Sequence, residues 1–248
     1  MTGSIGVSVA DHIAVVELQR APHNFFDEAL LTELADTVSS FDADTDVRAI
    51  VLCSQGRHFC AGADLRGMGA DGIRQVYRQA LRLFGARTPI IAAVHGRAVG
   101  GGLGLAMAAD FRVVAPDAQL TANFARLGFH HGFALSVTLP AAVGRQSGQD
   151  LLYTGRVVDG IEAAALGLCD QVAEDPRAAA TAYAREIAAA APLAVAAIRA
   201  TMRRSLLSEV ITALDVEATA QAALLDTSDF AEGIAASVAK RQPTFTGA

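Results

Sequence analysis

A chain of 248 residues is long enough for one large α/β domain with a helical addition. Its net charge of −6 and the lack of a basic stripe in the sequence exclude a general nucleic-acid binder, because such proteins neutralise phosphates with clustered Lys and Arg. Charged residues make up only 19% of the chain and hydrophobic residues 52%, a balance that favours a large core or an extensive subunit interface.

The sequence also bears on cellular compartment and thiol chemistry. It contains no run of about 18 uncharged apolar residues and no basic N-terminal segment followed by an apolar one, so we expect a soluble, cytoplasmic protein. Cys53, Cys60 and Cys169 are odd in number and lack metal-type spacing, which predicts reduced thiols and no metal site. Cys60 lies close to His58, but we favour a small packed residue near a tight turn over a nucleophile.

In chain order, the first predicted elements form a hairpin followed by a β-α-β unit. Two short apolar runs joined at Asp11 and His12 predict an antiparallel pair. A stretch with apolar residues at helical spacing follows, with Asp27 as its N-cap, and leads into an apolar run that predicts a parallel strand. The predicted strands are 5–9, 13–18 and 49–53, and the predicted helix is 27–41.

The remaining chain alternates strands with helices at first and is mostly helical towards its end. The glycine-rich stretch 67–72 is predicted to be mobile, and Pro192 is predicted to separate two helices. Further strands are predicted at 90–94, 111–114, 119–120 and 168–172, and helices at 73–84, 133–143, 160–167, 177–190, 193–204, 207–225 and 228–240. The densest basic cluster is Arg199, Arg203 and Arg204, whose helical spacing predicts a solvated face.

Two glycine-rich turns each follow a predicted buried strand. One contains Gly56 and Gly62, and the other contains Gly100 and Gly101 and opens a small-residue helix. A glycine lets a ligand approach the backbone, and a helix N-terminus has unpaired N–H groups and a partial positive charge. If the two turns face each other, two N–H groups converge on one oxygen, as in an acyl-transfer or enolate site.

Four segments in series resemble the crotonase superfamily, the enoyl-CoA hydratase/isomerase group. They are 58–65 (HFCAGADL), 95–110 (HGRAVGGGLGLAMAAD), 151–172 (LLYTGRVVDGIEAAALGLCDQV) and 232–247 (EGIAASVAKRQPTFTG). The resemblance implies an α/β fold built as a spiral of ββα units, with a core over 1–190 and a C-terminal helical trimerisation region over 191–248. It also implies a homotrimer or hexamer, a coenzyme A thioester as substrate and no separate cofactor.

The resemblance assigns an oxyanion hole to the backbone N–H groups of Ala63 and Gly101. In the family, the backbone near Ala61, Asp64 and Leu65 lies along coenzyme A, and Gly100 and Phe124 border the thioester and acyl group. A tail lysine, here Lys240, approaches the phosphates in the family, but Ser237 stands where the family often has an aromatic residue, so a plain surface lysine is the alternative. For the Asp64 side chain we favour the N-cap of a helix over catalysis.

The chain departs from the family at the positions of proton transfer. The two glutamates of family hydratases align with Gly104 and Phe124, and a third carboxylate position aligns with Gly132. None of the three can transfer a proton. Histidine titrates near neutral pH, so we predict His131, and then His130, as the replacement acid or base. The alternative is that each only caps a helix or hydrogen-bonds a carbonyl.

The reaction itself stays open at this point. Hydration or dehydration, double-bond isomerisation, and C–C or thioester hydrolysis all fit an enolate or tetrahedral oxyanion site, and the two replacements favour a bulkier or more apolar acyl group. A second hypothesis is a non-catalytic acyl-CoA binder. A dinucleotide-binding oxidoreductase is disfavoured because Leu105 stands where GxGxxG needs a glycine, and a serine hydrolase because GxSxG does not occur.

Overall fold

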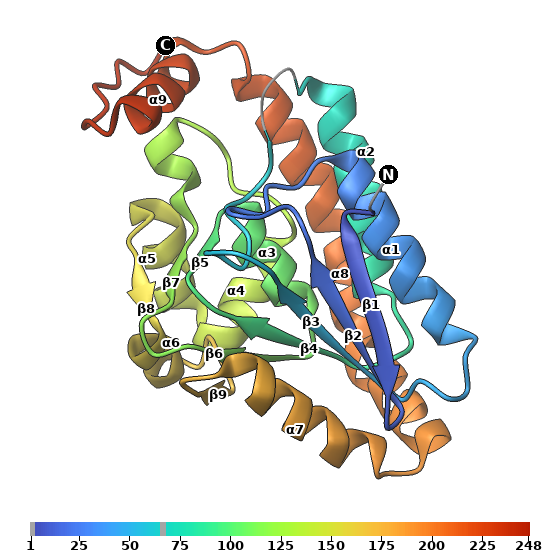
Figure 1. Ribbon diagram of the computed structural model, residues 1–248. Helices are drawn as coiled ribbons and strands as arrows, with labels where there is room; N and C mark the ends of the chain where they lie inside the picture. Colours follow the sequence, from blue (N-terminus) through green and yellow to red (C-terminus); the bar gives the residue numbers. More distant parts are fainter. Residues whose placement is uncertain (1–2, 65–67) are drawn as a thin grey trace.

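A six-stranded sheet runs through the centre of the computed structural model, which describes residues 3–64 and 68–248 (Figure 1). Its strand order is β1-β2-β3-β4-β6-β9, with β1 antiparallel to β2 and every other neighbouring pair parallel. These strands are β1 (Ile5–Ala10), β2 (Ile13–Leu18), β3 (Ala49–Ser54), β4 (Ile90–Val94), β6 (Phe111–Val114) and β9 (Gln171–Val172). A smaller sheet has the order β5-β7-β8, formed by β5 (Arg97–Val99), β7 (Gln119–Thr121) and β8 (Val158–Asp159).

Helices cover both faces of the central sheet. The helices are α1 (Glu28–Asp42), α2 (Ala70–Phe84), α3 (Gly101–Ala108), α4 (Leu135–Val143), α5 (Arg145–Thr154), α6 (Gly160–Leu166), α7 (Pro176–Ala188), α8 (Pro192–Leu224) and α9 (Ser228–Ala239), with a 3₁₀ helix, η1, at Asn123–Leu127. Figure 1 shows α7 along one side of the sheet and α1, α2 and α8 on the other. The fold is therefore a layered α/β structure with a mostly parallel sheet.

The sequence of β3 explains this layering. Successive strand residues point to opposite faces, and all six residues of β3 are buried. Ile50 and Leu52 pack in the large core with α1 and α2, whereas Ala49 and Val51 pack with the alanines of α7 in a smaller core. An apolar run without alternation is what a strand covered on both faces requires.

The first predicted elements are confirmed. β1 and β2 form an antiparallel hairpin, with Asp11 and His12 at its turn, and β2 pairs parallel to β3 through the α1 crossover. Asp27 caps α1 as predicted, since its Oδ1 accepts a hydrogen bond from the Leu30 N–H at 2.8 Å.

Several predicted boundaries are wrong. Helix α2 begins at Ala70, inside the stretch predicted to be mobile, of which Gly67 lies outside the described residues. The two helices predicted over 193–225 are one continuous helix, α8, because no glycine or proline interrupts it after Pro192. Helix α4 begins at Leu135, two residues later than predicted. Strand β5, helix η1 and the separate helix α5 were not predicted.

The predicted solvated face at Arg199 and Arg203 is also wrong. Asp110, at the end of α3, accepts hydrogen bonds from Arg199 Nε at 2.9 Å and from Arg203 Nη1 at 2.7 Å. Only 8% of the Arg199 side chain is exposed. The spacing that we interpreted as a surface stripe therefore joins α8 to the core, and only Arg204 is exposed.

No single helix among residues 3–64 and 68–248 has the length and apolar character of a membrane span. The pair α7 and α8 passes such a test only together, with a bend of 107° between them.

Candidate active site

The two glycine turns meet beside Phe26. The Phe26 N–H donates to Gly62 O at 3.0 Å, and the Asp64 N–H donates to Phe26 O at 2.7 Å. In this parallel bridge Phe26 bonds to both neighbours of Ala63, so the Ala63 N–H points away from Phe26. A Cβ placed on Gly101 would lie 3.8 Å from the Ala63 nitrogen. The N–H groups of Ala63 and Gly101 therefore belong to one small space.

Both N–H groups remain available in this space. Within residues 3–64 and 68–248, neither donates a hydrogen bond to a backbone carbonyl. Gly101 is the first residue of α3, where N–H groups lack partners within the helix and the dipole is positive. The preceding residue, Gly100, has φ 55° and ψ −117°, a conformation that suits glycine. Such an arrangement can stabilise a carbonyl oxygen that gains negative charge.

Strand β5 joins the two turns. Cys60 donates its N–H to Arg97 O, and Val99 donates its N–H to Cys60 O, both at 3.0 Å. Gly102 leaves room for this approach, because a Cβ there would lie 2.1 Å from Cys60 O. Only a turn was predicted here, because the alternation of Arg97, Ala98 and Val99 is the one local signal of β5 and three residues are too few to distinguish a strand.

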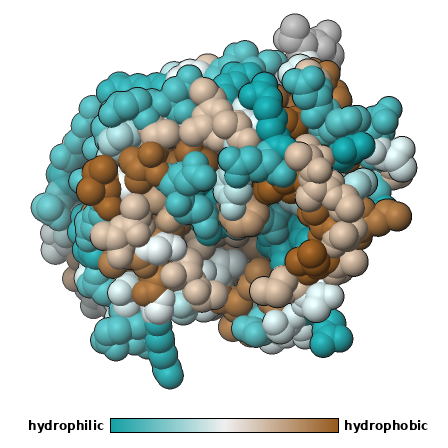
Figure 2. Space-filling view, turned by 90° about the horizontal axis from the view of Figure 1, so that it is seen from below, coloured by the Kyte–Doolittle hydropathy of each residue, from teal (hydrophilic) through white to brown (hydrophobic). Residues whose placement is uncertain are grey.

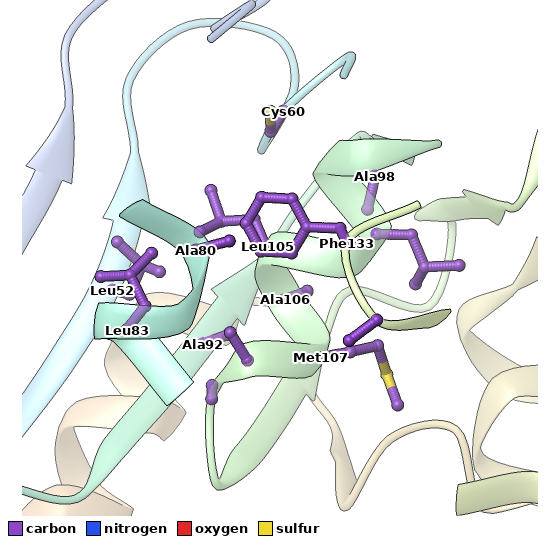
Figure 3. Packing of buried hydrophobic residues seen from close by; sticks show 14 of the residues in the cluster. Leu52, Cys60, Ala80, Leu83, Ala92, Ala98, Leu105, Ala106, Met107 and Phe133 are labelled. Carbon is purple, nitrogen blue, oxygen red and sulfur yellow. The ribbon is translucent and has the colours of Figure 1, made fainter. Parts of the chain in front are cut away.

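Phe133 fills the space in front of Gly104. A Cβ on Gly104 would lie 2.4 Å from Phe133 Cβ, and Figure 3 shows the Phe133 ring beside Leu105 and Ala106 of α3. The ring is fully buried and packs edge-on against Phe26, with ring centroids 5.7 Å apart. Phe133 has a positive φ of 61°, so the chain adopts an uncommon conformation to place this ring. No side chain longer than hydrogen fits at position 104 unless Phe133 moves.

The Phe124 side chain lies next to the first residues of α3. It is buried in η1, and a Cβ on Gly100 would lie 3.5 Å from its Cζ atom and 3.3 Å from Asn123 Oδ1. The Phe124 ring and the Asn123 side-chain amide therefore both border the start of α3. Gly132 is equally crowded, because a Cβ there would lie 1.7 Å from the Tyr77 hydroxyl.

His130 and His131 lie in the loop that leads to Phe133. Their rings stack with centroids 4.1 Å apart, and His130 Nδ1 donates to His131 O at 2.7 Å. The Nε2 atom of His131 is buried without a hydrogen-bond partner among the described residues and lies 3.8 Å from Glu217 Oε1. Burial, and then His130, lower the pKa of His131 to about 4, so its imidazole is neutral at pH 7.

Comparison with known proteins agrees with this geometry. A family model described as enoyl-CoA hydratase/isomerase matches residues 8–248. The chain belongs to the enoyl-CoA hydratase/isomerase family. It is 33% identical to a Bacillus subtilis protein named probable enoyl-CoA hydratase, over 98% of this chain and 99% of that one. It is also 32% identical to the mouse mitochondrial methylglutaconyl-CoA hydratase, over 95% of this chain and 80% of that one.

Solved structures give the same result for the fold. The crystal structure of an enoyl-CoA hydratase/isomerase from Pseudoalteromonas atlantica superposes with a TM-score of 0.89 at 30% identity, over 98% of this chain and all of that chain. An enoyl-CoA hydratase from Mycobacterium avium subsp. paratuberculosis gives a TM-score of 0.90 at 25% identity, over 99% of this chain and all of that chain. The predicted crotonase-like α/β fold is therefore confirmed.

The predicted coenzyme A contacts are spread over the two turns and the tail. Ala61 lies in the first turn and donates its N–H to His23 O at 2.9 Å, whereas Leu65 lies outside the described residues. The N-cap of α2 is Gly69, and the residues that directly follow Asp64 lie outside the described residues, so the capping role expected of the Asp64 side chain stays a prediction. Lys240 is exposed and ends α9 in a left-handed conformation.

Helix α9 packs against η1, which carries Phe124. Phe230 of α9 stacks on Phe129 with ring centroids 4.4 Å apart, and a Cβ on Gly233 would lie 2.3 Å from Leu127 O. The C-terminal helix of this family member thus supports the same segment that borders the N–H pair. Nothing in the local sequence indicated this long-range contact.

The cysteines are free and buried as expected. Burial raises the pKa of the Cys60 thiol to about 12, which leaves no reactive thiolate near pH 7. His58 stacks on His23 at 5.2 Å between ring centroids, and burial lowers its pKa. Among the described residues, no group of three or more His, Cys, Asp or Glu is arranged to hold a metal ion.

Glu217 contacts the loop of His130 and His131, and it was not among the residues predicted to lie at the site. It lies on α8, far along the chain, and only 1% of it is exposed. Its position on the helix resembles that of any core-facing residue, so no local pattern identified it.

Proposed function

We propose that this family member binds an acyl-CoA thioester and stabilises its enolate with the N–H groups of Ala63 and Gly101. The observation that carries the proposal is that two backbone N–H groups from different turns, neither bonded to a backbone carbonyl of the described residues, share one space at the start of a helix. Charge develops on the thioester oxygen when the Cα proton leaves, and each donor aimed at that oxygen is worth a few kcal/mol.

The proposed base is His131. Its neutral imidazole takes the Cα proton through a ring nitrogen, and the C–H electron pair moves into the enolate, whose oxygen faces the two N–H groups. Phe133, two residues after His131, lies over Gly104, which is three residues, about 4.5 Å along the helix axis, from Gly101. This placement supports His131 as the base. His130 is the second candidate, with its Nδ1–H already used by a carbonyl.

The acyl group is proposed to be apolar. Phe26, Phe124 and Phe133 are buried around the N–H pair, and no carboxylate stands at Gly104 or Phe124 to hold a water. Because Phe133 already fills the space at Gly104, the replacement of glutamate by glycine does not enlarge the site there. These contacts support an apolar acyl group more than a bulkier one.

Coenzyme A is proposed to lie along Ala61, Asp64 and Leu65, next to Gly100, with Lys240 near its phosphates. We also propose cytoplasmic localisation and a homotrimer or hexamer, with residues 191–248 as the oligomerisation region. Apolar side chains exposed on the first half of α8 support self-association, namely Leu193, Ile198 and Met202. Figure 2 shows the molecule from below, where α7 and the start of α8 lie, with hydrophobic residues gathered on this face.

The reaction is tested with a panel of enoyl-, ketoacyl- and hydroxyacyl-CoA thioesters, including methylglutaconyl-CoA, followed by chromatography with mass detection. Gain or loss of one water identifies hydratase chemistry, a retention shift at constant mass identifies isomerisation, and free coenzyme A identifies hydrolysis. The names of the relatives support hydratase or isomerase chemistry. The proposal predicts a change of one of these kinds on an apolar acyl chain.

The alternative is a non-catalytic acyl-CoA binder that uses the two N–H groups only as a thioester clamp. The apolar residues at Gly104, Phe124 and Gly132 favour it. This alternative would be established by binding to several thioesters without any conversion, together with a His131→Ala variant that changes affinity alone. The same result would contradict the proposed enzymatic activity.

A further inference from the structure

Two polar side chains of α8, four residues apart, form hydrogen bonds with the loop 130–136, which carries His131. Gln221 Nε2 donates to His130 O at 2.8 Å. Glu217 accepts the Ala134 N–H at 2.7 Å on Oε2, and the Ser136 N–H at 3.0 Å on Oε1. The Ser136 hydroxyl also donates to Oε1, at 2.6 Å. Gln221 therefore holds the loop before His131, and Glu217 holds it after His131.

His131 is the one polar neighbour of Glu217 in this loop whose hydrogen bond is not closed. Its Nε2 atom is buried without a partner among the described residues and lies 3.8 Å from Glu217 Oε1, about 0.9 Å beyond a normal N–H···O distance. A small rotation of the imidazole closes this gap. Because Glu217 is a buried carboxylate that already receives three donors, the bond expected here runs from Nε2–H to Oε1.

We propose that Glu217 is a positioning residue for proton transfer, which holds His131 with Nε2–H towards α8 and leaves Nδ1 as the nitrogen that accepts the substrate proton. This inference rests on the proposed function of His131. When the lone pair of Nδ1 accepts the Cα proton, an N–H bond forms and the C–H bond breaks. The electron pair of the C–H bond stays in the enolate. The ring then carries a positive charge, and the Glu217 carboxylate stabilises it.

The titratable groups facing this pair are consistent with the assignment. They are His130, stacked on His131, and Tyr77 of α2. The Tyr77 hydroxyl donates to Gln221 Oε1 at 2.7 Å, and its pKa is raised well above the usual range by burial and by Glu217. Tyr77 thus neither neutralises Glu217 nor donates to it. Burial raises the pKa of Glu217, and its three hydrogen bonds act in the opposite direction.

The first test reads the tautomer of His131 directly. The full-length protein is labelled with ¹⁵N-histidine, the His131 signals are assigned with a His131→Asn variant, and long-range ¹H–¹⁵N spectra are recorded at pH 7. The proposal predicts a neutral ring protonated on Nε2 in the wild type, and loss of this preference in Glu217→Gln. Glu209→Gln, an exposed glutamate on the same helix, serves as matched control and leaves the spectrum unchanged. A ring protonated on Nδ1 in the wild type would overturn the proposal, whatever the activity.

The second test uses kinetics on whichever thioester the panel identifies. Glu217→Gln is expected to lower kcat at least tenfold more than it raises KM, and the double variant with His131→Asn is expected to be no slower than His131→Asn alone. Full additivity of the two losses would show that Glu217 acts only on the fold. Since Glu217→Gln itself risks misfolding, Ser136→Ala provides the second variant: it removes one donor to Oε1 and is expected to preserve the His131 tautomer. Absence of turnover on every thioester would contradict the proposed function and leave the tautomer result standing.

Discussion

At the scale of single residues, His131 combines a buried ring with an unusual pKa. Burial and the neighbouring His130 lower this pKa from 6.5 to about 4. The neutral form is therefore present across the physiological range, and one nitrogen of a neutral imidazole is free to accept a proton. The residue that sequence reasoning chose for proton transfer has the charge state that proton abstraction requires.

The lowered pKa predicts a pH dependence of stability. Because the folded pKa is below the unfolded value, the unfolded chain binds the proton more tightly, so the contribution of His131 is present above pH 6.5 and is lost as pH falls towards 4. Between pH 7.5 and 5.0 this loss amounts to about 2 kcal/mol. Urea denaturation at the two pH values should therefore show the wild type losing about 2 kcal/mol more than His131→Asn. Equal losses would contradict the burial of a neutral ring.

Gly104 and Phe133 pack directly against each other, so a larger residue at 104 is expected to lower stability unless Phe133 is also changed. Introducing a glutamate at 104 places its Cβ 2.4 Å from Phe133 Cβ, so Gly104→Glu is expected to destabilise the fold by at least 1–3 kcal/mol. Adding Phe133→Gly removes both the Cβ and the ring that obstruct it, at a positive φ that suits glycine, and is expected to recover part of that loss. Thermal unfolding of the two single variants and the double variant measures the coupling. Simple additivity of the two losses would contradict the contact.

At the scale of secondary-structure elements, α8 is connected to the core by an ion network. Asp110 accepts hydrogen bonds from Arg199, Arg203 and the Ile90 N–H, the last at 2.8 Å, so it links the end of α3 to α8 and β4. Burial lowers the pKa of Arg199, and Asp110 opposes that change. The stability of the fold is therefore expected to fall when Asp110, the one acid that both arginines share, is removed.

Asp110→Ala leaves two largely buried guanidinium groups without their acid. Breaking a buried pair in this way typically costs about 3–5 kcal/mol, and we expect a loss of that size in chemical denaturation followed by circular dichroism. Arg204→Ala removes an exposed neighbour on the same helix and should change stability by less than about 0.5 kcal/mol. A loss for Asp110→Ala no larger than that of the control would show that the network contributes nothing.

Local patterns predicted those elements whose cause is local. The Asp27 cap, the hairpin and the apolar run of β3 each depend on neighbouring residues, and all three were predicted correctly. Strand β5 is too short to show a period. We predicted a break at 204–207 that does not exist, because no glycine or proline interrupts α8 there. Arg199 was taken as exposed because spacing alone does not reveal its partner, Asp110, 89 positions earlier.

At the scale of the whole molecule, the exposed apolar side chains of α8 support the proposed homotrimer or hexamer. Leu193 and Met202 are each 73% exposed on a helix whose second half is packed against the core. Sedimentation velocity is expected to give three or six times the 25.7 kDa subunit mass, and Leu193→Glu with Met202→Glu should shift the distribution towards monomer. A monomeric wild type at micromolar concentration would contradict the predicted oligomer.

The candidate site shows the same division between local and long-range signals. The glycines of both turns and the apolar run before each turn predicted that two N–H groups could meet, since these features are local. The residues that shape the site come from elsewhere: Phe133 enters the space at Gly104, and Glu217 reaches the loop from α8. Their side chains are ordinary core residues in the sequence, and only the fold brings them to the site.

The most direct test of the account is exchange of the Cα hydrogen. Saturated acyl-CoA thioesters of several chain lengths have no double bond to hydrate and no leaving group on the acyl chain, so deuterium that the acyl chain takes up in D₂O reports ionisation of the Cα–H bond. Hydrolysis is recognised separately by the release of free coenzyme A. The wild type is expected to incorporate deuterium well above the buffer rate, and His131→Asn is expected to be slower by about 10²–10⁴-fold while still binding the thioester. Thioester binding without any exchange above buffer would contradict an enolate held by Ala63 and Gly101, and would favour the non-catalytic binder.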